Sequence, residues 1–360
     1  MSILPDAETF RRLADGTLRG PGPCLARSLL GGLALPYGLV TAVRNAAYDR
    51  GVLRAHAGPV PVISVGNLTL GGTGKTPLVA WVARWLATRG RRPAIVSRGY
   101  ASRPGEASDE AAELALLLPG VPHVADRDRV AGVTTAAGRG ADVAVLDDGF
   151  QHRRLRRDLD IVALDASDPF GCGHLVPRGL LRESVHGLAR ADAVVLTRAT
   201  SVPTARRAEL RQVVERTRRG RPPLIWVEAE HRPVALRSAA GTVEPLERAR
   251  GTRVAAFCGI GNPAAFRRTL TDMGVGPVGF RGFADHHAYG PADLETLGGW
   301  ARDLQAELVV TTLKDLVKIR RDRLGNLPLV ALEVALEPLG DAAPLVAAIE
   351  AAAVRGGHVA

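Results

Sequence analysis

Lysine and aromatic residues are scarce in this sequence of 360 residues. Three lysines occur (Lys75, Lys314 and Lys318), so arginine supplies the other 44 of the 47 basic residues. The formal net charge is +10, but the arginines are scattered among acids, and aromatic residues are only 4% of the chain. Without a stripe of aromatics for stacking bases, the charge does not indicate nucleic-acid binding. The positive charge fits an anionic lipid or a phosphate-bearing substrate at least as well as it fits nucleic acid.

Cysteine is also rare. Cys24, Cys172 and Cys258 are odd in number and far apart. Their spacing implies neither a disulfide framework nor a zinc site, and a reducing compartment is the simpler expectation.

Long hydrophobic runs are missing as well. The uncharged run Ser28–Val43 falls short of the roughly 20 apolar residues that span a bilayer. Two interpretations stay open at this stage. The segment forms a buried or docking helix, or it lies in a membrane interface with Arg27, Arg44 and Arg50 at its edges.

Short apolar runs rich in Val, Ile and Leu alternate with helical patterns in the first part of the chain. Runs that are apolar on both faces and alternate with helices are typical of a mainly parallel sheet covered on both sides. The sequence therefore predicts a doubly wound α/β domain. The predicted strands are 60–66, 93–97, 142–147, 159–165, 192–197 and 223–229.

The pattern changes at His231, where two alternating stretches around Gly241 predict a hairpin. Strand and helix patterns then resume, which predicts a second, smaller α/β domain. Its predicted strands are 253–260, 307–312 and 328–334. The expected organisation is an N-terminal membrane-docking segment (1–50), a nucleotide-binding domain (51–230), a hairpin linker (231–250) and a smaller domain (251–360).

A glycine-rich loop lies between the first predicted strand and a predicted helix. Gly74, Lys75 and Thr76 match the G-K-[ST] end of the phosphate-binding loop G-x-x-x-x-G-K-[ST], while Thr69 replaces its first glycine. Gly71 and Gly72 can supply the tight turn instead. The predicted nucleotide-binding residues are Thr69, Leu70, Gly71, Gly72, Thr73, Gly74, Lys75 and Thr76. In such a loop the lysine reaches the β and γ phosphates and the hydroxyl binds Mg²⁺.

The run "VAVLDDGFQH" places Asp147 and Asp148 at the end of a buried strand. A carboxylate at the carboxyl end of a neighbouring parallel strand is where a phosphate-loop enzyme holds Mg²⁺ or its water shell. Gln151 and His152 follow on the turn after this strand, and either side chain could simply cap that turn.

Two classes of nucleotide-binding protein are disfavoured. ATPases that partition chromosomes carry a signature lysine before the glycines, where this chain has Leu70. The guanine-binding motif N-K-x-D is absent, and "TTLKD" (311–315) is the nearest run to it. Adenine is thus favoured by default.

The order of several short motifs resembles the tetraacyldisaccharide 4′-kinase family of lipid A biosynthesis. The motifs are "VPVISVGNLTLGGTGKTP", "SRGYASR", "SDEA", "VLDDGFQHRRLRRDLDIVALDA", "GLLRES", "ADAVVLTR", "FCGIGNP", "FADHHAY" and "TTLKD". The resemblance implies a P-loop NTPase-like fold. It also implies a kinase that transfers the ATP γ-phosphate to the 4′-hydroxyl of a tetraacylated glucosamine disaccharide 1-phosphate.

The resemblance also implies roles for individual residues. Lys75 would bind the β and γ phosphates, Thr76 and Asp147 would serve Mg²⁺, and Asp148 would help to organise the transferring phosphate. Asp109 in "SDEA" would be the catalytic base, tuned by His286 in "FADHHAY". A sugar hydroxyl must lose its proton as the phosphoryl group arrives, and a carboxylate beside an imidazole can accept it.

Simpler roles stay open for some of these residues. Asp109 would also cap the helix that follows it, and His286 could be an ordinary loop histidine. Ser108 stands where the family has glycine, and the segment before it is short. Arg182 in "LLRES" resembles a family arginine near the nucleotide or substrate phosphates, and Arg98 lies beside the "SRGY" turn, but both could equally form surface ion pairs. The predicted substrate residues are Arg98, Gln151, His152 and Arg182.

The resemblance implies a place of action and partners. Segment 28–50 would dock the enzyme as a peripheral protein at the cytoplasmic face of the inner membrane, and the active site would lie in a cleft between the domains. The cofactors would be ATP and Mg²⁺, with no nucleic acid and no obligate protein partner. Two alternatives stay open: another P-loop phosphotransferase, and a nucleotide-switched ATPase that binds a partner at the membrane.

Overall fold

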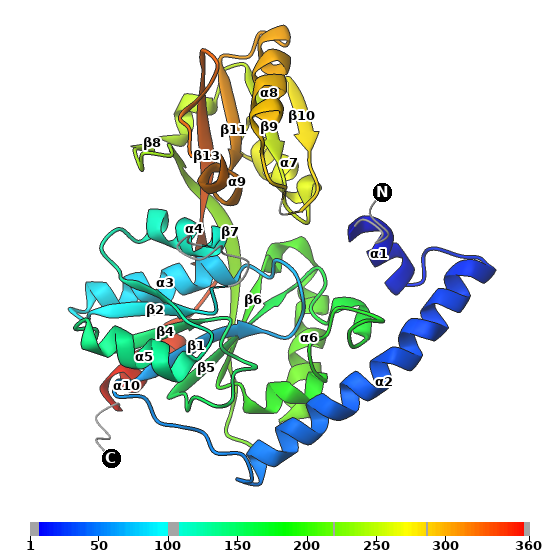
Figure 1. Cartoon of the computed structure of the whole chain (residues 1–360), viewed down its shortest axis with the longest axis vertical. Helices are drawn as coiled ribbons and strands as arrows, with labels where there is room; N and C mark the ends of the chain where they lie inside the picture. The colour runs from blue at the N-terminus through cyan, green and yellow to red at the C-terminus, as the bar shows by residue number, and fades with distance from the viewer. Residues whose placement is uncertain (1–6, 100–107, 219, 286, 356–360) are drawn as a thin grey trace. The chain divides into compact units, whose positions relative to one another are not determined.

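The computed structural model describes residues 7–99, 108–218, 220–285 and 287–355 (Figure 1). Contacts within the chain divide it into two compact units. The first unit contains Met1–Ala101, Leu118–His231 and Leu336–Ala360, and the second contains Ser102–Leu117 and Arg232–Ala335.

A parallel sheet forms the centre of the first unit, with strand order β7-β6-β5-β1-β4-β2-β3. The residues of β1, β2, β4 and β6 are all buried, as expected for strands of Val, Ile, Ala and Leu that are covered on both faces. The strands are β1 (Val62–Asn67), β2 (Pro93–Ser97), β3 (His123–Ala125), β4 (Val143–Asp147), β5 (Leu159–Asp165), β6 (Ala193–Thr197) and β7 (Ile225–Arg237).

Helices precede, connect and follow these strands. They are α1 (Ala7–Ala14), α2 (Pro21–Asp49), α3 (Lys75–Thr88), α5 (Arg129–Gly138), α6 (Thr204–Thr217) and α10 (Ala343–Arg355), with short 3₁₀ turns η1 (Gly171–Gly173), η2 (Val185–Arg190) and η3 (Ala199–Ser201). Apolar faces of α5 and α6 contribute to two separate hydrophobic clusters of the core.

The second unit is a smaller α/β structure with strand order β10-β9-β11-β13. Its elements are α4 (Asp109–Leu117), β8 (Val243–Glu244), η4 (Leu246–Ala249), β9 (Val254–Cys258), α7 (Pro263–Asp272), β10 (Gly279–Gly282), α8 (Pro291–Asp303), β11 (Leu308–Thr312), α9 (Leu313–Ile319), β12 (Arg323–Leu324) and β13 (Leu327–Pro338). The strands β9, β10, β11 and β13 pair in parallel. The predicted fold class, a mainly parallel α/β structure, is confirmed.

The structure divides the chain differently from the sequence expectation in two places. Helix α10 packs on β1 and α3 through Leu345, Ile349 and Ala352, so the last helix belongs to the first unit and not to the smaller domain. Helix α4 packs on α9 and belongs to the second unit, although it lies within the expected nucleotide-binding domain. Both assignments depend on contacts between segments far apart in the sequence.

The hairpin around Gly241 is present, since β8 pairs antiparallel with the end of β7. However, β7 is one continuous strand from Ile225 to Arg237. The last strand predicted for the first domain and the first arm of the hairpin are therefore the same element.

Helix α2 contains the uncharged run, and none of its residues is buried. It is long and apolar enough to cross a membrane by length and composition. The exposed side chains of Leu25, Leu29, Leu33, Leu39, Val40 and Val43 lie on one side at helical spacing. Leu35 is also exposed, but it lines a cavity between α2 and the rest of the first unit. A buried core helix, one of the two interpretations left open, is not what the structure shows.

Candidate active site

The sheet brings the two sequence motifs together at one edge. Strands β1 and β4 are parallel neighbours, with Val65 opposite Asp147. The glycine-rich loop leaves β1 at Asn67 and enters α3 at Lys75, while Asp148 follows β4. The Lys75 ammonium therefore lies 2.8 Å from a carboxylate oxygen of Asp148.

A close backbone approach holds the two motifs in register. A Cβ on Gly66 would lie 2.5 Å from the Cβ of Phe150, so only glycine fits at this point of β1. Phe150 is fully buried. This contact explains why "SVGN" and "DDGF" have these residues: the turn after β4 must lie directly against β1.

Polar side chains from the ends of β1 and β6 hold the glycine-rich loop. The Asn67 side-chain amide donates to the Thr69 carbonyl at 2.8 Å and to the Thr73 hydroxyl at 3.0 Å. The Thr197 hydroxyl, at the end of β6, donates to the Thr73 carbonyl at 2.8 Å. Arg198 donates to the Gly72 carbonyl at 3.1 Å. The sequence analysis missed Asn67, Thr197 and Arg198, although they lie at the carboxyl ends of β1 and β6, where functional residues are expected.

The helix α3 begins at a glycine that has no room for a side chain. Gly74 has φ of 80°, a left-handed conformation, and a Cβ there would lie 2.2 Å from the imidazole of His231. Burial, together with the nearby Arg198, lowers the pKa of His231 to about 4. A neutral imidazole thus packs against the loop at Gly74.

Asp148 lies at the centre of a charged cluster. Besides Lys75, it accepts two hydrogen bonds from one nitrogen of Arg182, at 2.8 and 2.7 Å. Burial alone would raise the pKa of Asp148, but Lys75 and Arg182 outweigh it and hold that pKa well below its usual range. Asp148 also has a φ of 59°, a conformation uncommon outside glycine. Such backbone strain is typical of functional sites.

Gln151 lies beside this cluster, because its side-chain oxygen accepts from Arg182 at 3.4 Å. The charged neighbours of His152 are other residues, among them Arg129 and Asp128. The Gln151 amide donates to the Asn67 carbonyl at 2.8 Å and to Glu183 at 3.1 Å. Glu183 is buried and pairs with Arg190 at 2.8 Å. Burial, then the nearby Arg129, lowers the pKa of His152 to about 4, and its buried Nε2 has no hydrogen-bond partner. In these contacts the Gln151 side chain binds Asn67 and Glu183 and does not simply cap its own turn.

The predicted metal ligands occupy the ends of two elements. Thr76 is the second residue of α3, and Asp147 is the last residue of β4 and is buried. A hydroxyl and a carboxylate are the protein donors that phosphate-loop sites offer to Mg²⁺, which takes its other ligands from water and phosphates. Within the part of the chain that the structure describes, no group of three or more His, Cys, Asp or Glu could hold a metal by itself. The donors fit a cation held largely by nucleotide oxygens.

Arg98 and Asp109 lie at the ends of two other elements. Arg98 follows β2 and is exposed. Asp109 is the first residue of α4 in the second unit, where the Ser108 hydroxyl accepts from the Ala111 amide at 3.3 Å. Ser108 therefore occupies the capping position of α4, and Asp109 is the first residue of the helix. His286 lies outside the described residues.

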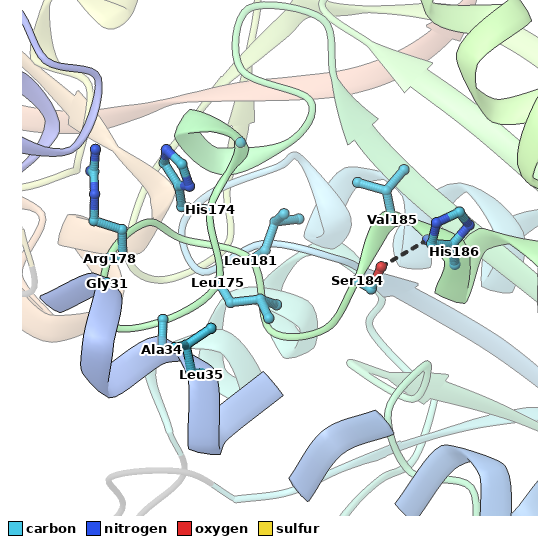
Figure 2. A pocket seen from close by; sticks show the side chains of 11 residues that line it. Gly31, Ala34, Leu35, His174, Leu175, Arg178, Leu181, Ser184, Val185 and His186 are labelled. Atoms are coloured by element: carbon cyan, nitrogen blue, oxygen red, sulfur yellow. Dashed lines mark hydrogen bonds between the residues drawn. The ribbon is translucent and has the colours of Figure 1, made fainter. Parts of the chain in front are cut away.

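The contact side of α2 meets the loop that carries Arg182. The Tyr37 hydroxyl donates to the Arg182 carbonyl at 2.7 Å, and Asn45 donates to Glu183 at 2.9 Å. A cavity of about 380 Å³ opens beside these contacts. Figure 2 shows Leu175 and Leu181 facing Ala34 and Leu35 of α2, with Arg178 and His174 near one another.

A phosphate-type loop between a parallel strand and a helix, with carboxylates after the next strand, defines a nucleotide-dependent phosphotransfer enzyme of the P-loop class. Known proteins are similar over nearly the whole chain. A family model described as tetraacyldisaccharide-1-P 4′-kinase matches residues 26–353. The chain therefore belongs to the tetraacyldisaccharide 4′-kinase family, and it is a kinase.

Individual relatives agree with this family. A tetraacyldisaccharide 4′-kinase of Anaeromyxobacter sp. (strain K) is 44% identical over 322 residues, with 83% of each chain covered. One of Geobacter sulfurreducens is 38% identical over 363 residues, covering 95% of this chain and 98% of that one. The crystal structure of LpxK from Aquifex aeolicus in complex with ATP matches with a TM-score of 0.72 and 31% identity, covering 91% of this chain and 99% of that one. The family predicted from the sequence motifs is confirmed.

Proposed function

We propose that this kinase transfers the γ-phosphate of ATP to the 4′-hydroxyl of a tetraacylated glucosamine disaccharide 1-phosphate at the cytoplasmic face of the inner membrane. The observation that carries the proposal is the cluster of Lys75, Asp148 and Arg182 beside the glycine-rich loop. It offers two cations within 2.8 Å of one carboxylate. Family membership supplies the substrate class.

The cluster is suited to exchange partners when a nucleotide binds. Asp148 pairs with both Lys75 and Arg182, which keeps two strong cations ordered near the loop. An incoming polyphosphate would compete with Asp148 for the Lys75 ammonium. The loop amides and the N-terminus of α3 would then bind the phosphates together with Lys75.

Mg²⁺ would be held by Thr76 and Asp147, and when bound it would neutralise charge on the phosphates. Gln151, His152 and Arg98 are proposed to contact substrate or nucleotide. Asp109 is proposed to accept the proton of the sugar hydroxyl, and His286 to tune it. The expectation of an active site in a cleft between the domains stays a prediction.

Helix α2 is proposed to dock the enzyme on the membrane. Its exposed leucines and valines would enter the acyl boundary, and the arginines at its ends would meet anionic head groups. Its opposite side contacts the loop of Arg182 and Glu183, so docking would present the membrane surface to the site. The apolar cavity beside α2, with Arg178 and His174, suits a lipid that carries a phosphate.

The test is phosphoryl transfer from γ-labelled ATP to detergent-dispersed disaccharide 1-phosphate. A labelled lipid product is expected, and Asp109→Asn should lower kcat about 100-fold or more, because a positioned base contributes that much. The KM for ATP should stay within about two-fold, since the base is not expected to bind the nucleotide. Release of free phosphate alone would refute the transfer. Lost ATP binding in Asp109→Asn would refute the role of Asp109 as base.

A further inference from the structure

The motif "TTLKD" has no role in the site described so far, yet it leads into α9, which carries two of the chain's three lysines, Lys314 and Lys318. In a chain with 44 arginines, a lysine marks a place where a compact ammonium fits and a planar guanidinium does not. The Lys318 side chain is only 9% exposed. Such a buried cation requires partners, and α9 and α4 supply them.

Lys318 lies between two carboxylates of the second unit. Its ammonium is 3.5 Å from a carboxylate oxygen of Asp315 and 3.7 Å from one of Asp109. Asp109 is at the start of α4, and Asp315 is one turn before Lys318 in α9. The ammonium thereby connects the two helices, which pack against each other.

Asp315 is a rigid anchor for this lysine. It is fully buried, and one of its oxygens accepts from the Gly259 amide at 2.9 Å and from the Thr312 hydroxyl at 2.7 Å. The Thr312 hydroxyl also accepts from the Asp315 amide at 3.2 Å, which caps α9. The Asp315 carboxylate therefore cannot turn, and its other oxygen faces Lys318.

We infer that Lys318, anchored by Asp315, is a positioning residue that holds the Asp109 carboxylate in the orientation needed for proton transfer. The inference rests on the proposed role of Asp109 as base. The Ser108 hydroxyl caps α4, and the carboxylate of the next residue, Asp109, lies 3.7 Å from the Lys318 ammonium. Lys318 supplies a charge that attracts it, on a stem fixed by a buried anchor. Without Lys318, the Asp109 carboxylate would lose this charged partner and would adopt the reactive orientation less often.

The experiment uses the full-length enzyme and measures kcat and both KM values for Lys318→Met, Asp109→Asn and the double variant. Lys318→Met is expected to lower kcat about ten-fold and to leave both KM values within about two-fold. A ten-fold effect lies within the range of interaction energies found for residues in contact. In the Asp109→Asn background, Lys318→Met should cause no further loss, because the group it positions is gone.

A matched control removes another buried cation of the second unit. Arg237 pairs with Glu333 at 2.6 Å, and both side chains are largely buried. Arg237→Met should lower the thermal unfolding midpoint at least as much as Lys318→Met while leaving kcat unchanged. If Lys318→Met proves too unstable to purify, Lys318→Gln removes the charge but keeps a hydrogen-bond donor, and the same loss is expected.

Several outcomes would overturn the inference. Unchanged kcat in both Lys318 variants would show that the contact is structural only. A full ten-fold loss in the Asp109→Asn background would show that Lys318 acts independently of Asp109. Wild-type turnover in Asp109→Asn alone would refute the proposed base itself, and this separates a failure of the proposed function from a failure of the positioning role.

Discussion

Replacing Gly74 with alanine tests whether His231 shapes the phosphate loop. The new Cβ would lie 2.2 Å from the His231 ring, far inside van der Waals contact. The left-handed φ of 80° adds a separate penalty of about 1–2 kcal/mol for a residue with a Cβ. Forcing a methyl group into a packed site costs about 1–3 kcal/mol more. Gly74→Ala should therefore lose about 2–5 kcal/mol in loop stability or ATP affinity.

The two contributions can be separated with a second substitution. His231→Ala removes the ring, so the double variant Gly74→Ala/His231→Ala keeps the backbone penalty but loses the clash. ATP affinity by calorimetry should recover by about 1–3 kcal/mol relative to Gly74→Ala, which is about 5–150-fold in Kd. His231→Ala alone controls for loss of the imidazole. ATP affinity in Gly74→Ala equal to wild type, or no recovery in the double variant, would refute the argument.

Two further predictions concern pH and the membrane. The pKa values of His152 and His231 are lowered from 6.5 to about 4, so the unfolded chain binds more protons between these values and stability should fall as pH drops from about 6.5 to 4. The depressed pKa of Asp148 adds a further loss of stability at lower pH. In the double variant His152→Asn/His231→Gln, the free energy of unfolding measured with urea should depend less on pH between 6.5 and 4. The same pH dependence as in the wild type would contradict the assignment. For α2, the triple change of Leu25, Leu29 and Leu33 to serine should weaken binding to anionic vesicles by more than about 100-fold, since each buried leucine contributes about 1.5–3 kcal/mol. Serine at the exposed Val213 and Val234 is the control, and equal vesicle binding by both variants would refute docking through α2.

Much of the fold was predictable because its signals are local. Every strand predicted for the first domain is present, since a parallel strand covered on both faces must be a short apolar run. Strand β3 was missed because "HVA" has three residues and too little pattern. The phosphate loop and the aspartates after β4 were also found, because each lies directly after a strand.

The site was less predictable where it depends on chain-distant contacts. The sequence indicated Lys75, Asp148 and Arg182 separately, but not that one carboxylate would hold both cations. His231 looked like the start of a linker, whereas the structure packs it on Gly74. No local pattern announces such a contact.

The sequence by itself therefore determined the fold class, the phosphate loop and the family, because periodicity and short motifs are properties of neighbouring residues. Only the tertiary structure decided that α10 completes the first unit, that Ser108 caps α4, and that Lys318 lies between Asp109 and Asp315. These facts concern which distant side chains share a buried space. Buried side chains must match their neighbours in charge and size, and the packing of the whole chain determines which residues become neighbours.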